Sequence, residues 1–188
     1  MPGAAELVHN LPVRRILLTG LPPLEVLDLA GPLEVFSRCD GYRVEVASPQ
    51  RDGALPVNCG LTLTGARSYD QIAVPVDTLW VVGGPEAPAG VYDAAYLTWL
   101  RLTASSARRV GASCLGAFLL AAAGILKGRR VVTHWEWCDN LARQYPDVTV
   151  VRDAIYVKDG EVWTSAGITT GLDLALTFVE EDFGRARA

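Results

Sequence analysis

The sequence is poor in the side chains that bind metal ions or build disulfide frameworks. It has two histidines, His9 and His134, and four cysteines in 188 residues. No two cysteines form a Cys-X-X-Cys pair, which argues against a zinc site and against a disulfide framework. We therefore expect neither a metal ion nor a cofactor, and a reducing cytoplasm as the compartment. The cysteines are Cys39, Cys59, Cys114 and Cys138.

Long apolar runs and an excess of positive charge are also missing. No apolar run reaches the 18 or so residues needed to span a bilayer. The N-terminus lacks the charged and apolar segments typical of a signal peptide. The chain has 17 basic and 21 acidic residues, a net charge of −4, which leaves no basic face for nucleic acid. We expect a cytoplasmic protein without membrane contact, which reaches DNA only through a domain outside this chain.

What the sequence does contain is enough apolar material for one core. Half of its residues are hydrophobic, and a chain of this length can bury about 70% of its unfolded surface. We expect residues 1–12 to be a disordered tail and residues 13–188 to form a single domain.

Short apolar segments alternate with segments of helical periodicity, which predicts an α/β fold with a mostly parallel sheet and helices on both faces. The predicted strands cover residues 13–19, 42–47, 78–82, 109–113, 130–133, 148–151, 154–158 and 161–165. The predicted helices cover residues 24–38, 94–105, 117–126, 135–145 and 170–183. A small hairpin or an extended connection is expected within residues 57–64, and a hairpin is expected across Asp159-Gly160, a strong turn signal.

The strongest candidate for chemistry is Cys114, between a predicted strand and an apolar helix in Gly111-Ala-Ser-Cys-Leu-Gly116. Small neighbours allow the sharp turn that exposes the nucleophile in hydrolase elbows. The N-terminus of the following helix would lower the thiol pKa, and the Leu115 amide would face a developing oxyanion. The alternative is that Cys114 is a small buried hydrophobic side chain, as most free cysteines are.

Further polar groups follow predicted strands at the same carboxyl edge, where open α/β sheets bind ligands. The Gly84 amide is a candidate second oxyanion donor, or else part of a loop with unusual dihedral angles. Glu25 and Asp28 are candidate proton carriers, although Asp28 taken alone reads more readily as a helix N-cap. His134 either shuttles protons or is a structural histidine.

Five motifs that occur in order resemble the ThiJ/PfpI superfamily of class I glutamine amidotransferase-like domains, over residues 13–183. They are Leu27-Asp-Leu-Ala-Gly-Pro-Leu-Glu-Val-Phe36, Val81-Val-Gly-Gly84, Cys114-Leu-Gly-Ala-Phe-Leu-Leu-Ala-Ala-Ala-Gly124, Val132-Thr-His-Trp135 and Thr164-Ser-Ala-Gly-Ile-Thr-Thr-Gly-Leu-Asp-Leu-Ala-Leu176. Two subgroups are most similar: the N-terminal sensing domains of AraC-type transcriptional regulators, and the isonitrile hydratases. The resemblance implies a flavodoxin-like three-layer sandwich, a nucleophile-elbow cysteine and a homodimer.

The resemblance also implies roles for individual residues. Cys114, Asp28 and His134 match the positions of the catalytic group, if the protein is an enzyme. The remaining positions, which line the oxyanion or ligand site, are Gly84, Leu115, Glu25, Trp135, Ile168 and Thr169.

Two features depart from these relatives. Both subgroups commonly have threonine directly after the cysteine, and the PfpI-type peptidases have histidine, whereas this chain has Leu115. A hydroxyl that holds a polar substrate or water cannot be replaced by an isobutyl group, so ligand binding is favoured over hydratase or peptidase chemistry. The chain also ends at Ala188, where a helix-turn-helix domain follows in the regulators, and we expect it to be truncated there.

Three functions fit these observations. The favoured one is a small-molecule-sensing and dimerising domain of an AraC-type regulator. The second is a cysteine-dependent enzyme of the isonitrile hydratase type, with Cys114 attacking a small electrophile and Asp28 as acid and base. The third is a redox or stress sensor in which Cys114 is oxidised reversibly.

Overall fold

The computed structural model describes residues 13–188, so the tail expected at residues 1–12 lies outside the described residues. Its centre is a seven-stranded sheet in the order β10-β11-β7-β6-β1-β2-β5. Each neighbouring pair is parallel except β10 with β11, which confirms a mostly parallel sheet. The strands are β1 (Arg14–Gly20), β2 (Tyr42–Ser48), β5 (Arg67–Ser68), β6 (Thr78–Val82), β7 (Arg109–Ser113), β10 (Tyr156–Asp159) and β11 (Val162–Ser165).

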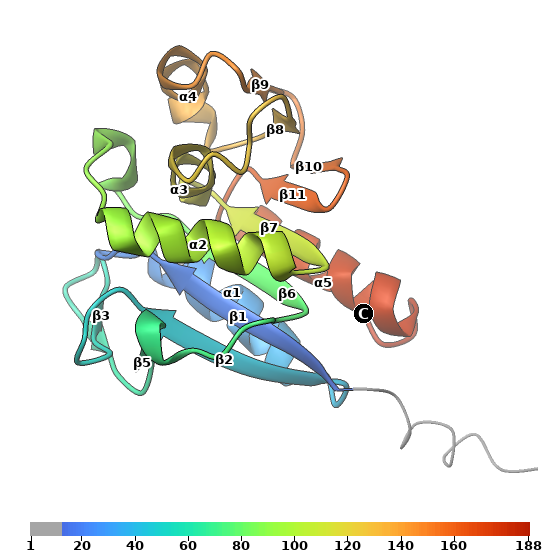
Figure 1. Cartoon of the computed structure of the whole chain (residues 1–188). Coiled ribbons are helices and arrows are strands. Elements are labelled where there is room, and N and C mark those ends of the chain that lie inside the picture. The colour runs from blue at the N-terminus through green and yellow to red at the C-terminus, as the bar shows by residue number, and fades with distance from the viewer. Residues whose placement is uncertain (1–12) are drawn as a thin grey trace, which may run out of the picture.

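Helices cover both faces of this sheet, as the alternating sequence pattern predicts (Figure 1). They are α1 (Val26–Ser37), α2 (Ala94–Ser106), α3 (Gly116–Ala122), α4 (Cys138–Gln144) and α5 (Thr169–Phe183). Helices α1 and α5 pack together on one face, and α2 and α3 lie on the other. The result is a three-layer α/β sandwich.

Two apolar cores result, one on each side of the sheet. Successive side chains of a strand point to opposite faces, so Ile16 and Leu18 belong to the core under α1 and α5, while Leu17 belongs to the core under α2 and α3. Strands β6 and β7 are buried along their whole length, as expected for central strands covered on both faces.

Both of these segments form hairpins. β3 (Leu55–Pro56) pairs antiparallel with β4 (Thr62–Leu63), and β10 returns as β11 across Asp159 and Gly160. In the second hairpin, β10 pairs antiparallel with β11 and becomes the edge strand of the main sheet.

Two predicted strands do not join the main sheet. Residues 130–133 and 148–151 contribute only β8 (Arg130–Val131) and β9 (Thr149–Val150), which pair with each other in a separate small sheet. With β10 next to β11, that edge of the main sheet is no longer open to them. The helix expected over residues 117–126 is also shorter, because α3 ends at Ala122 and Gly124 has a φ of +78°. None of the helices described over residues 13–188 is long and apolar enough to cross a membrane.

Candidate functional site

Several loops at the carboxyl ends of the central parallel strands enclose a cavity of about 160 Å³. The loops follow β1, β6, β7 and β11, the strands that parallel pairing brings to one edge of the sheet. The lining residues are Glu25, Gly83, Gly84, Pro85, Cys114, Leu115, His134, Trp137 and Ile168. Chain segments far apart in the sequence therefore meet at Cys114.

Cys114 occupies the turn between β7 and α3 and has a φ of +53°, a conformation that non-glycine residues adopt at a cost. Its main chain is tied on two sides: its N–H donates to the Ser165 carbonyl (3.1 Å), and its carbonyl accepts from Thr133 Oγ1 (2.8 Å). The turn also packs closely against the end of β6, because a Cβ on Gly83 would collide with the Leu115 backbone. These contacts fix the backbone of the turn that carries the thiol at the cavity.

The Cys114 thiol is buried, with 7% of the residue exposed. Burial raises its pKa above the ordinary value, and the nearby Asp28 carboxyl adds to the rise, while the Leu115 amide opposes it. The expectation of a lowered thiol pKa is therefore wrong. A short helix of seven residues supplies the dipole, and its effect on the thiolate is outweighed by the loss of water around the sulfur.

Asp28 is completely buried beside Cys114. Its Oδ1 accepts a hydrogen bond from the Ile168 main-chain N–H (2.8 Å), and its Oδ2 has no hydrogen-bond partner among residues 13–188. Burial raises the pKa of this carboxyl to about 6, against the opposing effect of the Ile168 amide and of Cys114. The N-cap interpretation of Asp28 is wrong, because Glu25 is the N-cap residue of α1 and the Asp28 side chain bonds to the turn before α5.

Glu25 and His134 provide the remaining titratable groups of the cavity wall. Glu25 Oε2 accepts a hydrogen bond from Asn58 Nδ2 (2.5 Å) in the loop between β3 and β4. His134 is half-buried, and its Nδ1 atom is buried without a partner in the described part of the chain. The Nδ1 atom of His134, a residue of the cavity wall, is thus left for a ligand or water to satisfy. Asp28 does not line the cavity, and its carboxyl interacts with the Cys114 thiol. No three His, Cys, Asp or Glu side chains within residues 13–188 are grouped as a metal site would require.

Comparison with known proteins places this architecture in a family. Residues 14–181 match the model of the DJ-1/PfpI family. The chain belongs to the DJ-1/PfpI family. The family resemblance found in the sequence motifs is thereby confirmed.

Relatives of this DJ-1/PfpI chain include both an enzyme and a regulator. It is 33% identical to isonitrile hydratase of Pseudomonas putida, over 87% of this chain and 69% of that protein. It is 32% identical to the HTH-type transcriptional regulator CdhR of Pseudomonas aeruginosa, over 90% of this chain and 50% of that protein. Among solved structures, a ThiJ/PfpI family protein from Pseudomonas syringae superposes with a TM-score of 0.82 at 27% identity, covering 96% of this chain and 75% of that one.

Most of the site residues predicted for the DJ-1/PfpI chain lie at this cavity. Three do not line it: Asp28 is completely buried beside Cys114, Trp135 is 75% exposed, and Thr169 is exposed at the start of α5. The cavity wall carries Trp137 instead, which the sequence analysis missed. The three-residue spacing between His134 and Trp137 was the available signal. In the structure, residues 135–137 form a 3₁₀ turn whose N-cap is His134. Residues three apart in such a turn point to the same side, which places Trp137 with His134.

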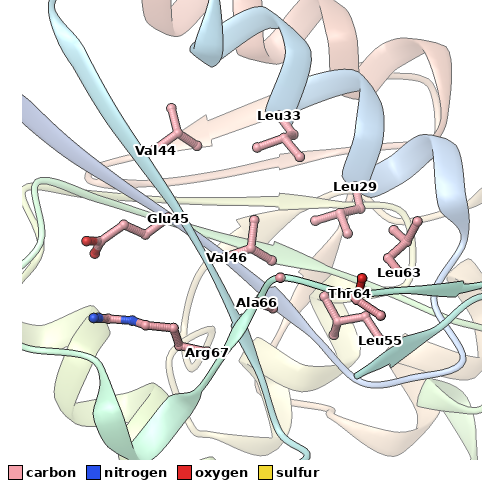
Figure 2. Close-up of a pocket in the computed structure, with 11 residues that line it drawn as sticks. Leu29, Leu33, Val44, Glu45, Val46, Leu55, Leu63, Thr64, Ala66 and Arg67 are labelled. Atoms are coloured by element: carbon pink, nitrogen blue, oxygen red, sulfur yellow. The ribbon is translucent and has the colours of Figure 1, made fainter. Parts of the chain in front are cut away.

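A larger cavity of about 410 Å³ lies elsewhere in the DJ-1/PfpI chain, between α1, β2 and the hairpin of β3 and β4 (Figure 2). Its walls are mainly apolar, and Figure 2 shows Leu29 and Leu33 of α1 beside Val44 and Val46 of β2. Its lining contains no thiol and no histidine. The smaller cavity is therefore the candidate functional site, because it contains the groups able to do chemistry.

Proposed function

We propose that this chain is a small-molecule-sensing domain of the kind found in AraC-type transcriptional regulators, which binds a ligand at Cys114 without converting it. The observation that carries this proposal is the state of the thiol. A nucleophilic cysteine must be available as thiolate, whereas burial and the Asp28 carboxyl both raise the pKa of Cys114. A thiol of raised pKa is suited to contact a ligand as a neutral group.

Leu115 supports the same conclusion. It lines the cavity next to Cys114 and belongs to the apolar core under α2 and α3. A leucine side chain supplies no hydroxyl to hold a water molecule or a polar substrate in a reactive position. Its contribution is an apolar wall, which favours binding of a ligand over its hydration.

The cavity also offers specific groups for recognition. Among the lining residues, His134 has a buried Nδ1 without a partner among residues 13–188, Glu25 supplies a carboxyl group, and Trp137 provides an aromatic wall. Ligand sites commonly combine apolar surface with a few polar groups that fix orientation. The 32% identity to the regulator CdhR over 90% of this chain is consistent with a sensing role.

The test screens small nitrogenous metabolites by thermal shift and follows hits by calorimetry, with mass spectrometry of the ligand after overnight incubation. We expect a ligand that raises the melting temperature and is recovered unchanged. Its affinity for Cys114→Ser should lie within about threefold of the original affinity, which corresponds to roughly 0.7 kcal/mol of binding free energy. Cys59→Ser, at an exposed cysteine, is the matched control. Conversion of the ligand by the unaltered chain but not by Cys114→Ser would overturn the proposal.

A second candidate is cysteine-dependent hydration of the isonitrile hydratase type, and Asp28 is the observation that favours it. A carboxyl whose pKa is raised to about 6 beside a thiol is suited to deliver a proton. Protonation of an isonitrile carbon and addition of water to that carbon would give an N-substituted formamide. Proton NMR of a simple alkyl isonitrile incubated with the chain tests this. A formamide signal that Asp28→Asn and Cys114→Ser both abolish would favour the enzyme.

A further inference from the structure

The turn that leads into α5, residues 166–168, packs against the side chain of Cys114. An ideal Cβ built on Gly167 would come within 2.8 Å of Cys114 Cβ and 2.9 Å of Cys114 Sγ. Gly167 itself has a φ of +122°. The turn therefore leaves no room for even a methyl group between itself and the thiol.

The two strained non-glycine residues of the described chain meet at this place. Within residues 13–188, positive φ outside glycine occurs at Cys114 (+53°) and Ile168 (+42°), and both line the same cavity. Such conformations cost of order 1–3 kcal/mol each and persist only where surrounding contacts hold them. Strain on both sides of one contact makes this contact sensitive to any change at the sulfur.

Hydrogen bonds hold the strained turn in place. The Ile168 N–H donates to Asp28 Oδ1 (2.8 Å). Thr170 Oγ1 accepts from the Gly167 N–H (2.8 Å) and lies 2.8 Å from the Gly167 carbonyl. The turn is thus bound both to the buried acid of the site and to the first turn of α5. A group that adds bulk at Sγ competes directly with these bonds, because the turn contacts the sulfur.

The other end of α5 is fixed to the opposite edge of the sheet. The Asp182 carboxylate, 2% exposed, pairs with Arg14, with Arg108 (3.0 Å) and with the buried Arg109 (2.5 Å). It also accepts a hydrogen bond from the Tyr42 hydroxyl (2.6 Å). These partners come from the starts of β1, β2 and β7. Any displacement that begins at the Gly167 turn must therefore be taken up in the first part of α5.

We propose that α5 is the output element of the Cys114 site. A group that occupies or modifies Sγ displaces Gly167 and Ile168, releases the Ile168 N–H from Asp28, and loosens the first two turns of α5 while the Asp182 anchor stays in place. The biological meaning of this coupling rests on the proposed sensing function, whereas the coupling itself follows from the contacts. A ligand shifts the equilibrium between the ordered and the loosened start of α5 only by the difference in its affinity for these two states.

Hydrogen–deuterium exchange of the full chain tests the coupling with iodoacetamide as the probe, in a Cys59→Ser background that removes the exposed thiol. In alkylation the sulfur–carbon bond forms, iodide leaves, and the thiol proton passes to solvent. We expect amides of residues 168–176 to exchange at least about fivefold faster after alkylation at Cys114, since local opening free energies set these rates. Amides of β6 and of the last turn of α5 should keep their rates. Unchanged exchange over residues 168–176 would overturn the proposal, as would uniform acceleration that includes β6.

Gly167→Ala tests the same contact without chemistry, because its methyl group would press on Sγ. Gly124→Ala is the control for a methyl group at a positive-φ glycine without a steric contact: Gly124 has a φ of +78° and no atom within 4 Å of its would-be Cβ. Gly167→Ala in a Cys114→Gly background is the control for the backbone strain at φ +122°, because it removes Sγ and keeps that strain. We expect faster exchange over residues 168–176 in Gly167→Ala and normal exchange there in Gly124→Ala. Equal exchange over residues 168–176 in the two variants would contradict the proposal.

Asp28→Ala and Asp28→Asn separate the hydrogen bond from the steric contact. Alanine removes the acceptor of the Ile168 N–H, whereas asparagine retains a carbonyl oxygen in its place. We expect faster amide exchange over residues 168–176 in Asp28→Ala, and a smaller increase in Asp28→Asn. Unchanged exchange over these residues in both variants would contradict the proposal. These readouts need no ligand, so a failed ligand screen would remove the sensing function and leave the coupling standing. Unchanged exchange over residues 168–176, together with a proven ligand, would remove the coupling and leave the sensing function standing.

Discussion

The properties of Asp28 arise from a conflict between burial and hydrogen bonding. Its position after the first strand could be predicted from the sequence, because a loop at the carboxyl edge must follow that strand. Its burial could not, since burial depends on how the turn before α5 closes over it. The sign of the pKa shift at Cys114 escaped prediction for the same reason: the sequence shows the helix that follows the thiol, and only the folded chain shows the loss of water around it.

Replacing Asp28 with Asn should remove a pH dependence of stability. The folded-state pKa of about 6 exceeds the ordinary value of 3.8, so the folded chain binds this proton more tightly than the unfolded chain. The free energy of unfolding therefore falls as pH rises between these values, by up to about 3 kcal/mol, with the full cost present above pH 6.

Urea denaturation of both proteins at about pH 4.5, 6 and 7.5 measures this effect, with midpoints converted through the common m-value. Other carboxyls titrate alike in the two chains, so the difference between the curves isolates Asp28. A difference that does not change with pH would show that Asp28 keeps an ordinary pKa.

Alkylation of Cys114 should be slow and should accelerate when the charge on Asp28 is removed. The thiolate is the reacting species, and the Asp28 carboxyl is the second cause of the raised thiol pKa after burial. We expect Asp28→Asn to speed iodoacetamide labelling of Cys114 by roughly threefold to tenfold at pH 8, while labelling of the exposed Cys59 keeps its rate. Peptide mass spectrometry over time measures both sites in one sample. Equal rates at Cys114 in the two proteins would contradict this account.

At the scale of elements, strands buried on both faces were the most predictable. The run that forms β6 is rich in β-branched and aromatic residues, and the run that forms β7 is short and ends at the candidate elbow cysteine, so both could be recognised from their own residues. The weaker runs at residues 130–133 and 148–151 resemble strands equally well, yet they pair with each other in a separate sheet, and β10 occupies the edge beside β11. The turn at Asp159 and Gly160 gives that edge to β10, and a single sequence does not rank such competitors.

The C-terminal anchor of α5 should contribute strongly to stability. Asp182→Asn would leave the buried Arg109 guanidinium, with 3% of its side chain exposed, without its closest carboxylate. Breaking a buried pair in this way costs about 3–5 kcal/mol. The matched control is Asp139→Asn, whose partner Arg152 is exposed, and which should cost at most about 1 kcal/mol. Chemical denaturation measures the free energy of unfolding of both variants. Similar decreases in the two variants would mean that the Asp182 cluster does not anchor α5.

At the scale of the whole molecule, one sheet carries two cores, and each core depends on the other through shared strands. Leu100 belongs to the core under α2 and α3, and Phe178 to the core under α1 and α5; both are fully buried. We predict that Leu100→Ala and Phe178→Ala each lower stability by about 2–5 kcal/mol, and that each shifts a single transition of the whole chain. Tryptophan fluorescence and far-UV circular dichroism should give coincident curves.

The homodimer that the family resemblance implies makes a separate prediction at this scale. If folding and association are linked, the denaturation midpoint rises with protein concentration, because mass action favours the associated folded state. Light scattering of the purified chain gives the mass directly, to be compared with 20.2 kDa for one copy. A mass of one copy together with a midpoint independent of concentration would exclude the dimer. In that case the loosening of α5 would have to act within one chain, where α5 packs against α1.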